Sequence, residues 1–352
     1  MSAALRGEFG FDQAAAGLLT TAIFLTHAAM QIPGGRLADR LGPGRVMTVA
    51  LAWIALANIA IAFSGAYWQL LFWKAVTGIG SGACFTSGAR YVFAAYQGKS
   101  LQMAQGLFGA AALMGSGFVI FAVPQLLEAL GWRGAFGACG GLALLALTIW
   151  VSLAPAVPTG HVAPSLSGLF SRKLLLLGMV QMASFGLVIV VGSWITSLLR
   201  TVYHMPLKTA GLLGSAVLML GIVSRPLGGW LVPVLGIRKL LTLALGLNAM
   251  ACVTLGHSES LPLTLAAIVM LGIGCGLPYA GIFNRAAMEF PGRAGAAMGL
   301  VNMVGIVMIL GGAPAVGWLA DLTGTFRSSF FALGGFSLVA ALTVAVTMRK
   351  ER

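Results

Sequence analysis

Long apolar runs alternate along the chain with short segments rich in glycine, proline and charged residues. A helix that crosses a bilayer needs roughly 20 apolar residues, because each residue advances the helix by only about 1.5 Å. The pattern therefore predicts an all-α, multi-pass membrane protein. Eleven runs reach the required length, near 13–34, 46–65, 69–92, 101–124, 132–153, 173–199, 210–233, 239–257, 262–287, 294–318 and 328–348.

The longest interruption lies at 154–172 and contains Pro155, Pro158 and Pro164. Proline-rich stretches between periodic segments are typical of linkers. We therefore expect a linker here, between an N-terminal bundle at 1–153 and a C-terminal bundle at 173–352.

Composition supports a place in the bilayer. Of the 352 residues, 59% are hydrophobic and 8% are charged, whereas a soluble domain has about a quarter of its residues charged. The net charge of +13 does not indicate a nucleic-acid partner, because the charges are spread between apolar runs. The four cysteines lack metal-ligand or redox spacing, so neither a metal nor a cofactor is predicted.

Basic residues predict the orientation of the spans. When 34–45 is placed in the cytosol, 14 of the 21 Lys and Arg residues fall in cytosolic segments and five in outer segments. This is the positive-inside pattern. We expect a protein of the cytoplasmic (inner) membrane with its linker and C-terminus in the cytosol. Arg349, Lys350 and Arg352 are among the 14.

An internal repeat relates the two halves of the chain. At a shift of 194 residues, AGLL at 16–19 aligns with 210–213, and GGRLADRLG at 34–42 aligns with GGWLVPVLG at 228–236. The shift becomes 193 after residue 100. Each half should then hold the same six helices, but the first half shows five.

The partner of 173–199 maps onto a segment that ends at residue 5. We therefore expect residues 1–5 to be the last turn of a first helix that is otherwise missing from this chain, through a misassigned start codon or a truncation. A genuine eleven-helix protein is the alternative.

The motif GRLADRLG at 35–42 resembles the cytosolic loop motif of the major facilitator superfamily, G-x-L-A-D-R-x-G-R-R/K. The departure is that the next basic residue is displaced to Arg45. A decayed copy stands at 229–236, with Pro233 and Val234 in place of the Asp and Arg. The resemblance covers all but the first helix. It implies two pseudo-symmetric six-helix bundles that move a solute by alternating access.

By this resemblance, Asp39 and Arg40 would form a charge latch in one transport state. Gly35 and Gly42 allow close packing and a tight turn. Arg90, at the cytosolic end of its run, is the candidate partner of Asp39. The alternative is that the arginines only fix the topology. Because the second copy lacks the charges, the latch is expected to work mainly through the first.

Arg225 is the strongest candidate for binding a substrate. It lies about eight residues, or roughly 12 Å, from the end of its run, and the spans contain no deep Asp or Glu. An unpaired buried charge is costly, and an anionic substrate would supply the missing partner. The alternative is that Arg225 snorkels or bonds to carbonyl groups.

The repeat aligns Arg225 with Gln31, and His27 lies one turn before Gln31. Within the superfamily, the chain resembles anion porters of the nitrate/nitrite–cyanate type. The resemblance to nitrate/nitrite porters implies an arginine in both helices, so Gln31 departs from their pattern. A site with one arginine suits a small monovalent anion, such as cyanate or an organic acid. His27 is either a proton carrier or a packed hydrogen-bond donor.

The remaining polar candidates within spans are Asn284, Asn302, Tyr279 and Gln105, which would contact substrate or join helices. The expected partners are a small-molecule substrate, the lipid bilayer and either a proton or a counter-anion, with the protein as a monomer.

Two other functions are alternatives to anion transport. An efflux transporter of uncharged or cationic compounds would leave Arg225 with a structural role. A non-transporting sensor or an inactive truncated homologue is an alternative of another class. An enzyme is not predicted, because no nucleophile–base pair, HExxH or GxSxG motif is present.

Overall fold

A computed structural model describes residues 2–158, 166–257 and 260–348. Every regular element in these ranges is helical, so the all-α prediction is confirmed, and each of the eleven predicted runs is mostly helical. In chain order the elements are α1 Ser2–Phe9, α2 Gln13–Leu41, α3 Pro43–Ala62, α4 Tyr67–Ala95, α5 Gly98–Leu153, α6 Arg172–Gln181, the π-helical segment η1 Met182–Gly186, α7 Leu187–Tyr203, α8 Leu207–Leu235, α9 Ile237–His257, α10 Leu261–Gly276, α11 Tyr279–Glu289, α12 Ala294–Thr323 and α13 Arg327–Thr347.

The motif at 34–45 is mostly helical, whereas the sequence analysis placed it in a loop. Helix α2 continues to Leu41, and the chain turns at Gly42, whose φ of 91° favours a residue without a Cβ. Pro43 then starts α3, at the position where a missing N–H costs nothing. Gly236, with φ 75°, makes the equivalent turn between α8 and α9.

The helices depart from regular α-helical geometry at three places, one between predicted runs and two within them. Gly131 leaves the helical region (φ 68°, ψ 179°) and divides α5 into the two runs predicted at 101–124 and 132–153. The run at 173–199 holds η1 between α6 and α7. The run at 262–287 is interrupted between α10 and α11 at residues 277–278, where Pro278 cannot donate a backbone hydrogen bond.

Nine helical segments in the described chain are long and apolar enough to cross a membrane. The predicted runs in α4 and in the first part of α5 fall outside this set. Both are long helices, and α4 contains Lys74 together with many Gly, Ser and Thr residues that lower its hydropathy. The chain is therefore a multi-pass integral membrane protein.

By packing, the chain divides into two compact units. Unit 1 comprises residues 1–95, 115–169 and 287–300, and unit 2 comprises 96–114, 170–286 and 301–352. Segment 96–114 belongs to the first half of the chain but packs in unit 2, and segment 287–300 belongs to the second half but packs in unit 1. At a shift of 193, residues 96–114 correspond to residues 289–307. The two exchanged segments therefore come from equivalent helices of the repeat. These packing units have other bounds than the two bundles expected at 1–153 and 173–352. The division into two bundles that move against each other stays a prediction.

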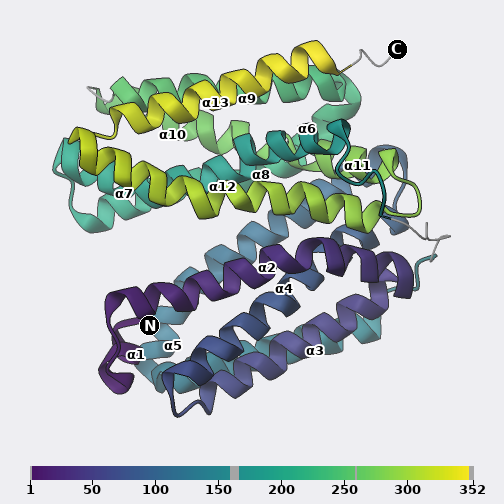
Figure 1. Ribbon diagram of the computed structural model, residues 1–352, viewed down its shortest axis with the longest axis vertical. Coiled ribbons are helices and arrows are strands. Elements are labelled where there is room, and N and C mark those ends of the chain that lie inside the picture. The colour runs from purple at the N-terminus through teal and green to yellow at the C-terminus, as the bar shows by residue number, and fades with distance from the viewer. Residues whose placement is uncertain (1, 159–165, 258–259, 349–352) are drawn as a thin grey trace. The chain divides into compact units, whose positions relative to one another are not determined.

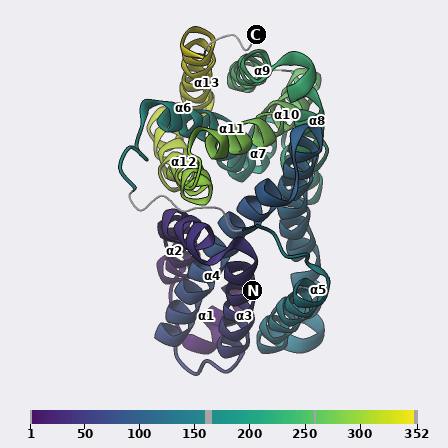
Figure 2. The same ribbon diagram turned by 90° about the vertical axis from the view of Figure 1, so that its right-hand side faces the viewer.

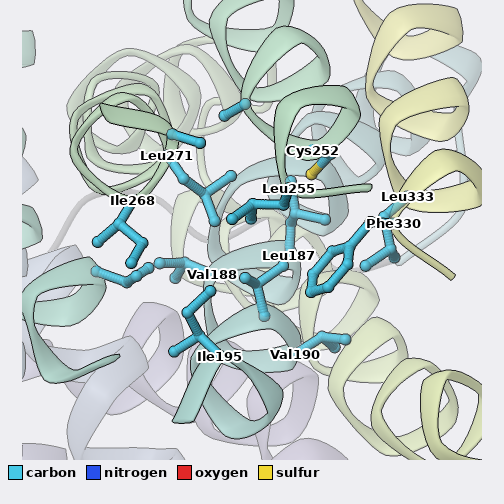
Figure 3. Close-up of a cluster of buried hydrophobic side chains, with 14 of the residues drawn as sticks. Leu187, Val188, Val190, Ile195, Cys252, Leu255, Ile268, Leu271, Phe330 and Leu333 are labelled. Atoms are coloured by element: carbon cyan, nitrogen blue, oxygen red, sulfur yellow. The ribbon is translucent and has the colours of Figure 1, made fainter. Parts of the chain in front are cut away.

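Each unit has its own apolar core. In unit 1, α2 and α3 pack against α4 (Figures 1 and 2), and Ile61, Leu70 and Trp132 are among the buried side chains. In unit 2, α13 packs against α9, and Leu187, Leu255 and Phe330 lie in a larger cluster (Figure 3). In a bilayer such cores are held mainly by close van der Waals packing.

Some sequence predictions lie outside the described residues. They concern the part of the linker at 159–165 and the terminal cations Arg349, Lys350 and Arg352.

A carboxylate ties α1 to the second part of α5. Glu8 Oε1 accepts from Arg133 Nη1 at 2.6 Å, and Glu8 Oε2 accepts from Trp132 Nε1 at 2.5 Å. The Arg133 guanidinium also lies 4.2 Å from the centroid of the Trp132 ring. The hydrogen bonds from Trp132 and Arg133 lower the pKa of Glu8 from its usual 4.5, because they stabilise the charged form. Helix α1 is therefore held by a contact that depends on pH.

We expect Glu8→Gln to weaken the attachment of α1 at neutral pH and to have no effect in acid. The folded protein lowers the pKa of Glu8, so its contribution is complete above the ordinary pKa and disappears as the pH falls through the folded value. Hydrogen exchange of residues 2–9, followed from neutral pH to about pH 3, measures the effect. Glu128→Gln is the matched control, because Glu128 is exposed and has no ion pair in the described chain. Equal exchange in Glu8→Gln and wild type at neutral pH would contradict the prediction.

Candidate functional site

Helix α2 and the start of α12 meet through their backbones in unit 1. A Cβ added to Gly35 would overlap the carbonyl oxygen of Gly295, and one added to Gly299 would overlap that of Gln31. Only glycine at both positions allows this approach.

Unit 2 contains the equivalent crossing, between α8 and the start of α5. A Cβ on Gly229 would overlap the carbonyl oxygen of Gln102, and one on Gly106 would lie 2.6 Å from that of Arg225. Gly35 aligns with Gly229, and Gly299 aligns with Gly106, so the repeat preserves the contact as well as the residue type.

Asp39 uses the first crossing to bind the first turn of α12. Its Oδ1 accepts from the backbone N–H of Gly295 at 2.9 Å, and its Oδ2 accepts from that of Ala296 at 3.1 Å. These amides have no partner within the helix, and the helix dipole favours an anion there. Arg90, the predicted partner, donates from Nε to Asp39 Oδ1 at 3.1 Å. We call Asp39, Arg90 and these two amides the latch.

Arg40 does not join the latch. Its side chain is exposed, and no ion pair forms on it in the residues that the structure describes. Successive residues on a helix point about 100° apart, so Asp39 and Arg40 cannot face the same neighbour. Of the motif residues predicted to gate, Gly35 and Asp39 make the contact with α12, and Gly42 makes the turn.

The second crossing carries a neutral pair in place of the latch. Asn284, which aligns with Arg90, donates from Nδ2 to Gln102 Oε1 at 2.9 Å. Gln102 aligns with Gly295. No ion pair occurs at this crossing in the described part of the chain, in line with the absence of Asp and Arg from the second motif copy.

Arg225 is buried in unit 2, with 4% of its surface exposed. Its Nη1 donates to the carbonyl oxygen of Gly109 at 2.6 Å, and its guanidinium carbon lies 4.4 Å from the ring centroid of Tyr279 and 5.7 Å from that of Phe185. Among the described residues, no carboxylate lies within 4.0 Å. The bonding to a carbonyl that the sequence analysis named as an alternative thus occurs, but it uses only one of five N–H donors.

Two backbone features build this environment. Gly109 has no side chain, and a Cβ there would overlap the Tyr279 ring. The π-helical segment η1 includes Phe185, and Asn248 Nδ2 donates to the carbonyl of Ala183 in the same segment at 3.0 Å. Such segments leave a backbone carbonyl without its usual helical partner and recur at functional sites. Sequence reasoning missed Gly109 and Phe185, and the glycine-rich face of α5 was the only available signal.

Several predicted site residues of unit 2 have buried polar atoms without a hydrogen-bond partner in the described chain, and one of them, Tyr279, contacts Arg225. These atoms are Gln105 Nε2 and Oε1, Tyr279 Oη and Asn284 Oδ1. Asn302, in contrast, accepts from Gln181 Nε2 at 3.1 Å and joins two helices. Buried polar groups normally find partners, so these atoms are candidates for contact with a ligand.

A small cavity adjoins Arg225. Its volume is about 10 Å³, and its walls include Leu113, Gly221 and Cys275. A space of that size holds about one water molecule. A substrate therefore requires this wall to move.

His27 and Gln31 lie together in unit 1, as their spacing predicted. Gln31 Nε2 lies 2.8 Å from His27 Nε2, and His27 Nδ1 lies 2.8 Å from Ser81 Oγ. With the amide donating to Nε2, the ring is neutral and donates from Nδ1 to Ser81. Gln31 Oε1 is buried without a partner in the described residues. This pair offers hydrogen bonds but no charge.

A metal site requires several His, Cys, Asp or Glu side chains close together. No group of three His, Cys, Asp or Glu side chains there could hold an ion, and the four cysteines are free thiols.

Comparison with known proteins places the chain in a family. A family profile described as "Major Facilitator Superfamily" matches residues 1–305 and 234–352. The "Probable nitrate/nitrite antiporter NarK1" of Thermus thermophilus is 24% identical over 389 aligned positions, which cover 98% of this chain and 86% of that protein. The "Probable sulfoacetate transporter SauU" of Cupriavidus necator is 33% identical over 141 positions, which cover 40% of this chain and 33% of that protein.

Solved structures show the same fold. The crystal structure of the transporter FucP in the outward conformation superposes with a TM-score of 0.80 at 15% identity, over 99% of this chain and 93% of that one. With the family profile, this similarity confirms the resemblance carried by the motif at 35–42. The chain belongs to the Major Facilitator Superfamily.

Proposed function

We propose that this transporter moves a small monovalent anion by alternating access and binds it at Arg225. One observation carries the proposal: the Arg225 guanidinium is buried, and no carboxylate in the described residues neutralises it. A buried charge without an opposite charge is destabilising, and a bound anion would supply one.

The chemistry around Arg225 suits an oxyanion. A guanidinium presents a planar fork of donors that matches carboxylate-like oxygens in a bidentate way. The Gly109 carbonyl holds one donor and so fixes the direction of the fork. Gln105 Nε2 and Tyr279 Oη are buried donors without partners among the described residues, and each would serve a second substrate oxygen.

The charge count favours a monovalent substrate. Arg225 supplies a single positive charge to the proposed site, and its counterpart in the repeat is the neutral Gln31, which is hydrogen-bonded to His27. A divalent anion would keep an uncompensated charge in a low-dielectric site. The names of the two relatives include nitrate/nitrite and sulfoacetate. Because the site has a single arginine, cyanate and a small organic acid are the substrates to test beside nitrate.

The latch supports an alternating mechanism. In this conformation it holds the first turn of α12 against the end of α2, and in a second state the contact would open. The positive-inside pattern supports a position of the latch on the cytosolic side of the inner membrane, the side on which the C-terminus is predicted. Binding of the anion would shift the balance between the two states.

We expect Arg225→Gln to abolish saturable anion uptake by purified protein in liposomes. Removing one partner of a buried, hydrogen-bonded charge pair costs about 2 kcal/mol or more, which corresponds to at least roughly 30-fold weaker binding. Arg225→Lys should restore part of the uptake, because it keeps the charge and loses the planar fork. Uptake of nitrate, cyanate and acetate, each against an uncharged solute, measures the effect.

Arg200→Gln is the matched control for Arg225→Gln, because Arg200 is exposed at the end of α7. It removes the same charge and should leave uptake unchanged. Anion uptake that is insensitive to Arg225→Gln, in a variant that remains monodisperse, would reject the anion site and favour transport of uncharged or cationic compounds.

We expect Asp39→Asn to loosen the start of α12. The substitution removes the charge that Arg90 and two backbone amides bind, and hydrogen bonds to a charged group contribute about 2 kcal/mol. Hydrogen exchange in residues 294–300 should accelerate by up to about 30-fold, and the transport rate should change with it.

Arg40→Gln serves as the control for Asp39→Asn, because Arg40 belongs to the same motif and is exposed. It should leave the exchange of residues 294–300 unchanged. Equal protection in Asp39→Asn and wild type would show that the carboxylate does not hold α12.

A further inference from the structure

Each unit has a surface groove at the turn between its motif helix and the next helix. In unit 1 the groove lies at the turn from α2 to α3, has a volume of about 580 Å³ and includes Arg40, Arg45 and Trp150. In unit 2 it lies at the turn from α8 to α9, has a volume of about 710 Å³ and includes Arg238 and Lys239. Both volumes are typical of small-molecule sites.

The two grooves are equivalent under the repeat. The segment 40–45 and Thr48 line the first groove, and the segment 234–239 and Thr242 line the second, at a shift of 194. The threonines hold the first turn in the same way: Thr48 Oγ1 donates to the Gly44 carbonyl at 3.1 Å, and Thr242 Oγ1 donates to the Arg238 carbonyl at 2.9 Å.

A bond to the last helix of the half closes each groove on one side. Trp150 Nε1 donates to the Gly44 carbonyl at 3.3 Å in unit 1. In unit 2 the direction is reversed, because Arg238 Nη2 donates to the carbonyl of Ala345 in α13. In both grooves this hydrogen bond joins the turn to the last helix of the same half.

Both grooves are positively charged. Each contains two basic residues, and none of the residues that form either groove is acidic. Arg45 and Lys239 align in the repeat, and both are exposed without an ion pair in the described chain. A ligand for these grooves is therefore an anion.

Both grooves include exposed aliphatic side chains. Val234 is 64% exposed and Leu243 63% exposed in unit 2, and in unit 1 Leu41 is 52% exposed and Val151 63% exposed. Aliphatic side chains at the end of a membrane span are covered by acyl chains, whereas a site for a free ion would be polar on all sides. Cations beside such walls match a phospholipid, with a phosphate above and acyl chains below.

We infer that both grooves bind the phosphate headgroup of an anionic phospholipid in the cytosolic leaflet. One lipid would sit at each motif turn, against Arg45 in unit 1 and against Lys239 in unit 2. A lipid so placed would link the end of the motif helix to the last helix of the same half. The inference is independent of the transported substrate, and it shares only the predicted orientation with the proposed function.

The test uses the full chain purified in a mild detergent, with lipid binding followed by native mass spectrometry. The probe is phosphatidylglycerol, compared with phosphatidylcholine and with inorganic phosphate. We expect two phosphatidylglycerol molecules to bind in preference to phosphatidylcholine, without competition from inorganic phosphate. Arg45→Gln and Lys239→Gln should each weaken one binding event roughly fivefold, and the double variant should weaken both.

The matched control is the double variant Lys99→Gln with Arg172→Gln. These residues are exposed, basic, predicted to be cytosolic and outside both grooves, so the control removes the same total charge. Arg45→Lys with Lys239→Arg keeps the charge and should restore binding, which separates loss of the site from loss of the fold.

Three results would overturn the inference. One is an equal loss of lipid in the control and in Arg45→Gln/Lys239→Gln, which would show diffuse attraction to the basic surface. Another is competition by inorganic phosphate at similar concentration, which would show a site for a free anion. The third is equal binding of phosphatidylglycerol and phosphatidylcholine. Because the readout is lipid binding, a failure here leaves the role of Arg225 in anion uptake to be judged by its own assay.

Discussion

Backbone contact at four glycines is the constraint on which the functional chemistry depends. Gly35 and Gly299 in unit 1, and Gly106 and Gly229 in unit 2, leave no room for a Cβ against the facing carbonyl groups. Between helices in a bilayer the hydrophobic effect adds little, so such close van der Waals packing supplies much of the attraction.

The same approach brings polar groups into reach. It lets a carboxylate at the end of α2 bind the amides of Gly295 and Ala296, and it sets α8 against the start of α5, where the Gly109 carbonyl meets Arg225. A larger residue at any of the four glycines would therefore disturb both the packing and the chemistry of its unit.

Much of this architecture could be predicted from the sequence, because apolar periodicity and repeated motifs reflect local rules. The helical runs, the repeat and the burial of Arg225 follow from the pattern of residues, whereas the pairing of Arg90 with Asp39 was implied by the resemblance of the motif to the superfamily. The extension of α2 through the motif could not be predicted, because charged and small residues suit a helix end as well as a loop. The decisive residue was Gly42, the first that leaves the helical region.

The surroundings of Arg225 were beyond sequence reasoning for another reason. Its hydrogen-bond partner is a main-chain carbonyl, and every residue has one, so no residue type marks the position. The position of the Phe185 side chain depends on the π-helical segment, which interrupts an otherwise regular apolar run. Residues 96–114 pack in unit 2 and residues 287–300 pack in unit 1. This arrangement depends on contacts between segments far apart in the chain, which local sequence patterns do not reveal.

The same glycine-mediated helix crossing occurs in both repeats, but the charged residues lie at different positions of it. In unit 1 the charges lie in the latch, where Asp39 is matched by Arg90 and by two backbone amides, and the equivalent of Arg225 is a neutral glutamine. In unit 2 the equivalent of the latch is a neutral amide pair, and the charge lies at Arg225, where a carbonyl and two rings compensate it only in part. A well-paired buried charge stabilises one arrangement, whereas an underpaired one destabilises the empty protein by an amount that a counter-ion recovers. Under the proposed function, the crossing in unit 1 would hold a conformation and the equivalent crossing in unit 2 would bind the anion.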